Sequence, residues 1–240
     1  MSTIKRLTAA VLIACLALAP SMVVSAATLS GTYDQSTSDV HLTTTGALDW
    51  VHFIASSTDT KSTGSGMTVT QVGGTDQTTA GGAVAFDWSD GTPNATGSTA
   101  AVTVTLDGTG TGWQVVLPAD THTKTGTVFG QGFFTGTADF TAHLSDSSAS
   151  DVTHTCTYGT NDPCNAHYTW AAASASQTLT VTFLNTTGNL CAIVAATIET
   201  DTPPSSGTPD VSGFFGQGLA TIFHYPQPLS WSRWIWRNRS

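Results

Sequence analysis

Apolar residues alternate with threonine along several stretches of the chain. In 100–106 (Ala-Ala-Val-Thr-Val-Thr-Leu) and 177–183 (Gln-Thr-Leu-Thr-Val-Thr-Phe) the later apolar side chains recur at every second position. This period of two predicts a β-strand with one buried side and one solvent-facing side. Threonine is β-branched and favours extended backbone, and it keeps the outer side polar without charge. The first stretch thus has a predicted core side and a predicted solvent side: Val102, Val104 and Leu106 against Thr103 and Thr105.

Similar runs follow one another along the chain and are separated by turn residues such as Gly73-Gly74 and Asp90-Gly91. Nowhere do apolar residues recur at helical spacing over ten or more residues. The predicted fold class is therefore all-β: an antiparallel two-sheet sandwich, jelly-roll or immunoglobulin-like. The expected strands lie near residues 28–33, 39–42, 48–54, 67–72, 83–88, 100–106, 113–117, 125–129, 138–144, 152–158, 166–172, 178–184 and 190–198.

The two ends of the chain differ from the body. Lys5 and Arg6 precede an apolar run that leads into small residues, which predicts a secretory signal peptide over 1–27 with cleavage after Ala26 or Ala27. The sandwich is expected over 28–200, and Pro, Gly and Ser in 201–210 indicate a linker. The tail 211–240 is rich in Trp and Arg, and we expect it to be poorly ordered. It has no apolar span of about 20 residues, so we expect no transmembrane segment.

The predicted domain is strongly acidic. Lys61 and Lys124 are its only Lys or Arg residues, against fourteen acidic residues, which gives 28–200 a formal charge near −12. Such a surface repels phosphate backbones and anionic headgroups, so we expect no nucleic-acid partner. Glu199 is the chain's only Glu, and most of the Asp residues are explained by turn formation.

Three cysteines remain after the predicted signal peptide. Cys156 and Cys164 bracket a turn-rich segment whose ends can meet across a hairpin, so we predict a disulfide between them; pairing with Cys191 is the alternative. Cys191 lies in an apolar run and is expected to be a buried thiol. A disulfide and a signal peptide together predict a secreted or cell-surface protein.

Six short sequence motifs follow one another along the body, at 45–52, 86–93, 113–121, 142–146, 168–172 and 177–181. With these motifs in this order, the chain resembles, over roughly 42–198, a β-sandwich module that is often repeated in secreted multidomain proteins of environmental bacteria. Phe53-Ile54 replaces the usual Trp-Gly of that module, and the two-cysteine loop is unusual. The resemblance implies a non-catalytic module that is appended to glycan-active or surface proteins.

Catalytic and metal motifs are weak. We find no pair of carboxylates that stands out from turn Asp, no Gly-x-Ser-x-Gly and no His-Glu-x-x-His, so we expect no enzyme and no cofactor. The seven histidines are scattered without His-x-His spacing, and no metal site is predicted from them. A structural calcium ion is the alternative that Asp87, Asp90 and Asp107 allow, because loop carboxylates suit a hard cation.

Tryptophan beside hydrogen-bonding residues is the best candidate for ligand binding. An exposed ring can stack on a sugar while neighbouring side chains bind its hydroxyl groups. The predicted clusters are Asp87, Trp88 and Asp90, and then Asp49, Trp50 and His52; core packing of these rings is the alternative, and Trp113 is assigned to the core.

The leading functional prediction is an extracellular binding or adhesion module for a glycan or a surface protein. A structural or assembly protein of the cell surface is the alternative, followed by a secreted hydrolase.

Overall fold

The computed structural model describes residues 26–54, 57–74, 77–105, 108–188 and 190–204. Within these ranges the chain forms β-strands and one helical turn, so the predicted all-β class is confirmed. Strand pairs are antiparallel, except for the parallel pair β2 and β6. Most of the predicted signal peptide and all of the predicted tail lie outside the described residues.

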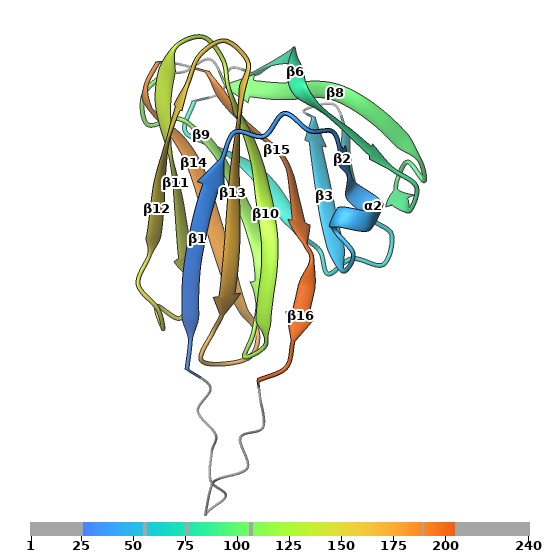
Figure 1. The fold of residues 1–240 in the computed structure, drawn as a ribbon, viewed down its shortest axis with the longest axis vertical. Coiled ribbons are helices and arrows are strands. Elements are labelled where there is room, and N and C mark those ends of the chain that lie inside the picture. The colour runs from blue at the N-terminus through green and yellow to red at the C-terminus, as the bar shows by residue number, and fades with distance from the viewer. Residues whose placement is uncertain (1–25, 55–56, 75–76, 106–107, 189, 205–240) are drawn as a thin grey trace, which may run out of the picture. The chain divides into compact units, whose positions relative to one another are not determined.

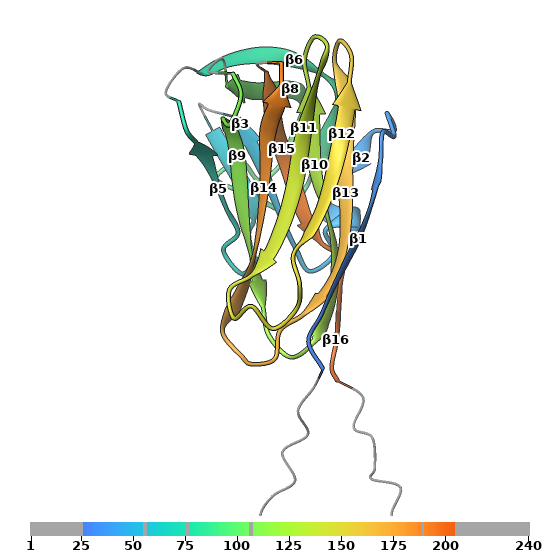
Figure 2. The ribbon, with the colours of Figure 1, turned by 90° about the vertical axis from the view of Figure 1, so that its left-hand side faces the viewer.

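The strands form three sheets, shown in Figures 1 and 2. The eight-stranded sheet contains, in spatial order, β1 (Thr28–Asp34), β13 (Asp162–Ala171), β10 (Thr123–Gly132), β15 (Cys191–Ile198), β3 (Asp49–Ile54), β4 (Ser57–Lys61) and β7 (Gly91–Thr92), and β16 (Thr200–Thr202) also pairs with β10. The five-stranded sheet contains β12 (Val152–Tyr158), β11 (Gly136–Leu144), β14 (Gln177–Thr187), β9 (Gly112–Ala119) and β5 (Thr68–Val72). The three-stranded sheet contains β2 (Val40–His41), β6 (Gln77–Trp88) and β8 (Gly97–Thr105), and the helical turn α2 (Leu42–Thr45) follows β2.

The main core lies between the eight-stranded and five-stranded sheets. Strands β9 and β11 alternate between buried and partly exposed residues along most of their length, as a period of two requires. Phe140 and Phe183 face each other across β11 and β14 with ring centroids 4.1 Å apart. Trp113 belongs to this core and is 1% exposed, so its predicted position is confirmed.

A second core lies on the other face of the eight-stranded sheet. Strands β6 and β8 arch over β15 and β3 (Figure 1) and contribute Val84, Phe86 and Val102 to this core. Trp50 and Ala195 meet them from the sheet below. The predicted sandwich therefore carries a third layer, which the alternation of single strands does not reveal.

The sequence of strand β15 shows no alternation of apolar and polar residues, and the structure shows the reason. All eight of its residues are buried, because the five-stranded sheet covers one face and the three-stranded sheet covers the other. The register with β10 shifts between Phe129 and Gly130, and Val194 is the extra residue on β15. This bulge moves the side-chain alternation by one residue, so that both Val194 and Ala195 face the second core.

The third layer covers only part of the large sheet. Strands β1 and β13 and the adjoining part of β10 stay uncovered on their outer face (Figures 1 and 2). On this face Ser30 and Thr32 are exposed and Thr125 and Thr169 are half-buried. A polar surface therefore continues directly from an apolar one on a single sheet.

For β8, the predicted core side is confirmed and the predicted solvent side is wrong. Val102 and Val104 are buried as expected, but Thr103 is 0% exposed, so its predicted solvent position is wrong. Three consecutive buried residues show that both faces of β8 are covered at this point. The side chains of Thr105 and Leu106 lie outside the described residues.

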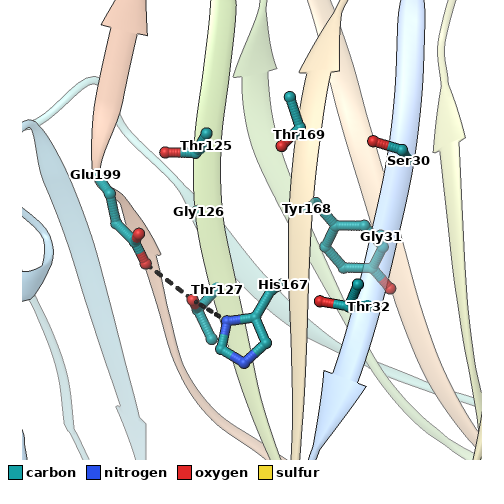
Figure 3. A pocket seen from close by; sticks show the side chains of 10 residues that line it. All are labelled: Ser30, Gly31, Thr32, Thr125, Gly126, Thr127, His167, Tyr168, Thr169 and Glu199. Carbon is teal, nitrogen blue, oxygen red and sulfur yellow. Dashed lines mark hydrogen bonds between the residues drawn. The ribbon is translucent and has the colours of Figure 1, made fainter.

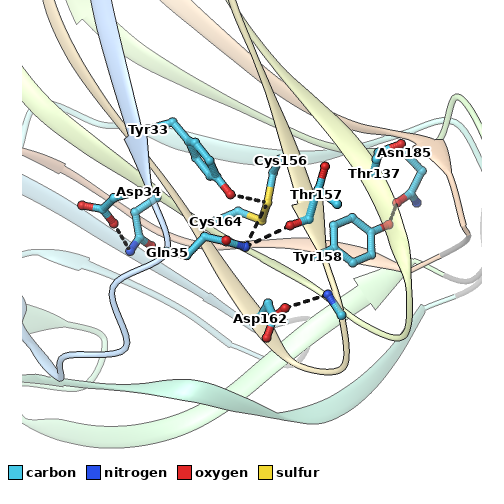
Figure 4. Close-up of a disulfide and its surroundings, with 12 residues drawn as sticks. Tyr33, Asp34, Gln35, Thr137, Cys156, Thr157, Tyr158, Asp162, Cys164 and Asn185 are labelled. Carbon is cyan, nitrogen blue, oxygen red and sulfur yellow. Dashed lines mark hydrogen bonds between the residues drawn. A yellow bond between two sulfur atoms is a disulfide. The ribbon is translucent and has the colours of Figure 1, made fainter.

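The predicted disulfide is confirmed. Cys156 on β12 is bonded to Cys164 on β13, so the bond joins the two sheets that enclose the main core. The Tyr33 hydroxyl donates to Cys156 Sγ at 3.2 Å and Gln35 Nε2 donates to the Thr157 carbonyl at 3.1 Å, which ties the end of β1 to β12 (Figure 4). Cys191 is a buried free thiol, and burial raises its pKa to about 12.

The boundaries differ from prediction where the strands are polar. Strand β4, Ser-Thr-Asp-Thr-Lys, has no apolar alternation, yet it pairs with β3 and β7. Strand β16 begins at Thr200 and extends into the predicted linker, where Asp201 and Thr202 pair with Lys124 and Thr123 of β10. The domain therefore extends beyond residue 200.

We expect Val104→Asp and Thr103→Asp to lower the free energy of unfolding by about 3 kcal/mol or more, because each places an unpaired charge in a buried site. Thr70→Asp, on the exposed side of the edge strand β5, is the matched control and should change it by less than about 0.5 kcal/mol. Urea unfolding measures all three. A Thr103→Asp variant as stable as the parent chain would contradict the burial of both faces of β8.

Replacing Cys156 and Cys164 together by Ser should lower the free energy of unfolding by about 2.5 kcal/mol, since the bond closes a loop of eight residues in the unfolded chain. Denaturant unfolding with and without a reducing agent measures the effect. The reducing agent should destabilise the parent chain and leave the double variant unchanged. Mass spectrometry that joins either cysteine to Cys191 would refute the assignment.

Candidate functional site

The two tryptophans predicted to bind a ligand are core residues. Trp50 is 0% exposed and Trp88 is 7% exposed, with ring centroids 5.7 Å apart, and His52 lies 5.0 Å from Trp88. A buried ring cannot stack on a sugar, so the predicted aromatic platform is wrong. Both rings are buried because the three-stranded sheet covers β3.

The carboxylates of the predicted clusters connect structural elements. Asp90 accepts hydrogen bonds from Thr43 Oγ1 (2.8 Å) and Trp50 Nε1 (3.0 Å), and Lys61 Nζ lies 2.6 Å away. Burial opposes ionisation of Asp90, but Lys61, Thr43 and Trp50 outweigh it and lower its pKa. Asp90 therefore joins α2, β3 and β4.

The other two carboxylates are also engaged within the chain. Asp49 accepts hydrogen bonds from both the backbone N–H and the hydroxyl of Ser65. Asp87 lies 2.6 Å from His41 on the surface. Asp107 lies outside the described residues. The calcium alternative stays a prediction.

His52 occupies an apolar position in the second core. Its ring lies between Phe86 and Trp88, and neither ring nitrogen has a hydrogen-bond partner among the described residues. Burial lowers its pKa to about 4, although the nearby Asp59 opposes this shift. The neutral ring is thus a packing residue.

The uncovered part of the eight-stranded sheet carries a different candidate site. Two adjoining pockets of about 260 Å³ and about 300 Å³ share Thr127, His167 and Glu199 in their lining. We call their combined surface the polar groove. The polar side chains in its lining include Ser30, Thr32, Asp34, Asp39, Thr125, Thr127, Asn165, His167, Thr169 and Glu199.

Strand register arranges these side chains in rows across the sheet. Ser30, Thr169, Thr125 and Thr200 are consecutive partners on β1, β13, β10 and β16. The next row along the strands contains Thr32, His167 and Thr127. Because side chains two residues apart share a face, both rows point to the same outer side.

A chain of hydrogen bonds crosses the groove (Figure 3). The Thr127 hydroxyl donates to Glu199 Oε1 at 2.8 Å and lies 2.9 Å from His167 Nδ1. His167 Nε2 lies 3.0 Å from Asp34 Oδ2. Asn165 Nδ2 then donates to Asp34 Oδ1 at 3.0 Å. Residues from β1, β10, β13 and the β15–β16 junction thus form one network.

The side chain of Thr127 links the two ends of this network. Its hydroxyl group donates its one hydrogen to Glu199 and also contacts Nδ1 of His167. The other ring nitrogen of His167 contacts Asp34. His167 and Thr127 therefore connect Asp34 to Glu199 across the groove.

The remaining contacts support an ionised Asp34. Burial opposes its ionisation, but the Ser36 backbone N–H, Asn165 and His167 donate to the carboxylate and lower its pKa below the usual value. Asp39 adds a third carboxylate at the rim of the groove. Among the described residues, no Lys or Arg belongs to the lining of either pocket. The groove therefore favours ligands that donate hydrogen bonds.

A second polar cluster already holds the ammonium group of Lys124. Asp120, His122 and Asp201 bring ligand atoms within 4.8 Å of one another. Lys124 Nζ lies 3.0 Å from an oxygen of Asp120 and 3.0 Å from an oxygen of Asp201. Because an ammonium group already neutralises these carboxylates, we treat the cluster as a clamp between β10 and β16.

Sequence reasoning missed the polar groove. The alternating Ser30, Thr32 and Asp34, and likewise Asn165, His167 and Thr169, signal polar strand faces. The order of β1, β13 and β10 in the sheet, which brings these faces together, is not visible in a single sequence. Glu199 could be singled out as the lone Glu, but its partner on β10 could not.

Comparisons of the chain with protein-family models, curated proteins and solved structures gave no match. The resemblance to β-sandwich modules of secreted bacterial proteins stays a prediction.

Because the pKa of His52 is about 4 in the folded chain and about 6.5 when unfolded, the unfolded chain binds the proton first as the pH falls. The free energy of unfolding should therefore decrease by about 3 kcal/mol between pH 6.5 and pH 4 and be fully restored above that window. Unfolding of His52→Phe should lack this decrease, whereas the exposed-site variant His143→Ala should retain it. An identical pH profile for His52→Phe and the parent chain would contradict the assignment.

Proposed function

We propose that this chain is an exported, non-catalytic β-sandwich module that binds a glycan outside the cell or at its surface, in the polar groove. The observation that carries the proposal is the juxtaposition of two hydroxyl rows with the Asp34–His167–Thr127–Glu199 network on one uncovered sheet face. Sugar hydroxyl groups both donate and accept hydrogen bonds, and this surface offers both partners.

The Cys156–Cys164 bond supports an oxidising compartment, as the predicted signal peptide does. Among the described residues, no helix is long and apolar enough to cross a membrane.

The geometry of Thr127 supports a non-catalytic role. Its contacts with His167 and Asp34 resemble a hydroxyl–histidine–carboxylate triad. However, Thr127 is 3% exposed, and its hydroxyl donates to Glu199. Its backbone N–H donates to Thr197 Oγ1 at 3.2 Å and is not free to bind an oxyanion. The network is thus suited to holding a ligand in place.

A structural or assembly role at the cell surface is the second candidate, and the outer face of the five-stranded sheet favours it. One row across all five strands consists of Thr153, Thr141, Thr182, Gln114 and Thr70, without a charge. The edge strand β5 also has no charged residue, so it lacks a common protection against edge-to-edge pairing.

A glycan array probed with the full chain, followed by calorimetry, tests the proposal. We expect binding with a dissociation constant in the micromolar to millimolar range. His167→Ala should weaken it at least about tenfold, since the substitution removes the imidazole that contacts both Asp34 and the Thr127 hydroxyl.

His143→Ala is the matched control. His143 also contacts an Asp from an outer sheet face and is similarly exposed, but it lies on the five-stranded sheet. Equal effects of the two substitutions would contradict binding in the groove. A chain that binds no glycan and self-associates in ultracentrifugation would favour the assembly role.

A further inference from the structure

The polar groove has an uneven charge and an uneven supply of hydrogen-bonding groups. Asp34, Asp39 and Glu199 line it, and His167 is the one basic side chain that the described part of the chain adds to the lining. Three carboxylates against one imidazole give the groove an acidic lining. The surrounding domain adds to this field, because residues 28–200 carry a formal charge near −12.

The side-chain oxygen of Asn165, beside Asp34, is a buried acceptor that also favours a hydrogen-bond donor in the groove. Asn165 lines the second pocket and is 4% exposed. Its Nδ2 is used by Asp34 Oδ1 and the Ser36 carbonyl, whereas its Oδ1 accepts no hydrogen bond among the described residues. An acceptor of this kind favours a ligand that brings donors.

The geometry points to a ligand class: we propose that the polar groove binds a glycan with free amino groups, in which an ammonium group lies among Asp34, Asp39 and Glu199. This inference rests on the proposed glycan-binding function and adds the charge of the sugar. An ammonium group supplies three donors and one positive charge, and it matches a site of carboxylates and an amide oxygen. The hydroxyl rows on β1, β13 and β10 bind the sugar hydroxyl groups.

The opposite ligand classes fit poorly. A uronic acid or sulfated sugar would place a negative charge beside three carboxylates, and no described Lys or Arg lines the groove to balance it. An N-acetylated sugar keeps the ring and its hydroxyl groups but loses the charge. Comparing the free-amine and N-acetylated forms therefore measures how much the charge of the amino group contributes to the affinity.

The test compares two oligosaccharides that differ only in acetylation: a β-1,4-linked glucosamine hexamer and its fully N-acetylated form. Calorimetry with the full chain near pH 6 should show about tenfold tighter binding of the free-amine form at low ionic strength. Raising the salt concentration to about 0.5 M should remove most of this preference and leave the acetylated form unaffected.

Substitutions locate the charge effect. Glu199→Gln keeps an acceptor for the Thr127 hydroxyl and should reduce the preference about fivefold. Asp39→Asn removes a charge from an exposed residue at the rim and provides a second variant if Glu199→Gln folds poorly. Asp151→Asn, an exposed carboxylate beside His143, is the control and should leave the preference unchanged.

The outcomes separate this inference from the proposed function. Equal or tighter binding of the acetylated or a uronic-acid oligosaccharide overturns the inference and leaves glycan binding standing. Binding of neither hexamer, nor of any other array glycan, overturns both. A lysine hexapeptide that binds more tightly than the glucosamine hexamer would also overturn the inference, because the groove would then select a charged peptide.

Discussion

Burial of β15 on both of its faces is the constraint on which the rest of the structure depends. Its eight residues are all buried, and the apolar ones, all except Thr197, can leave water only if a sheet packs on each side. The five-stranded sheet supplies one cover, and β6 and β8 supply the other. The bulge at Val194 adjusts the strand to both covers. The same requirement buries Trp50, Trp88 and His52 on neighbouring β3 and β6.

The three-stranded sheet is narrower than the eight-stranded sheet on which it packs. The polar groove lies on the part of the large sheet that it leaves uncovered. From β15 to β10, β13 and β1 the outer side chains change from Ala192 and Val194 to Thr125, Thr169 and Ser30. Glu199 lies at the break between β15 and β16, where the chain leaves the covered region, and its carboxylate turns to Thr127. The charged network thus lies directly beside the apolar layer.

Single strands and the disulfide could be predicted from the sequence, whereas the order of the strands in the sheets and the packing of one sheet on another could not. The alternation in 113–117 and 178–184 identified strands and the core position of Trp113, and the spacing of Cys156 and Cys164 identified the disulfide. The solvent side of Thr103 and the platform at Trp50 and Trp88 were wrong, because both depend on a layer contributed by distant strands. Asp34 and Glu199 are connected through His167 on β13 and Thr127 on β10, so a pattern within one strand cannot predict their network.

In the proposed function, ligand recognition takes place on the uncovered part of the eight-stranded sheet. Amide chemical-shift mapping during a titration with the glucosamine hexamer locates the binding surface. We expect the largest changes to cluster on β1, β13, the Thr125–Thr127 segment of β10 and Glu199. Changes centred on the threonine face of β11, β12 and β14, or around Trp50 and Trp88, would contradict it.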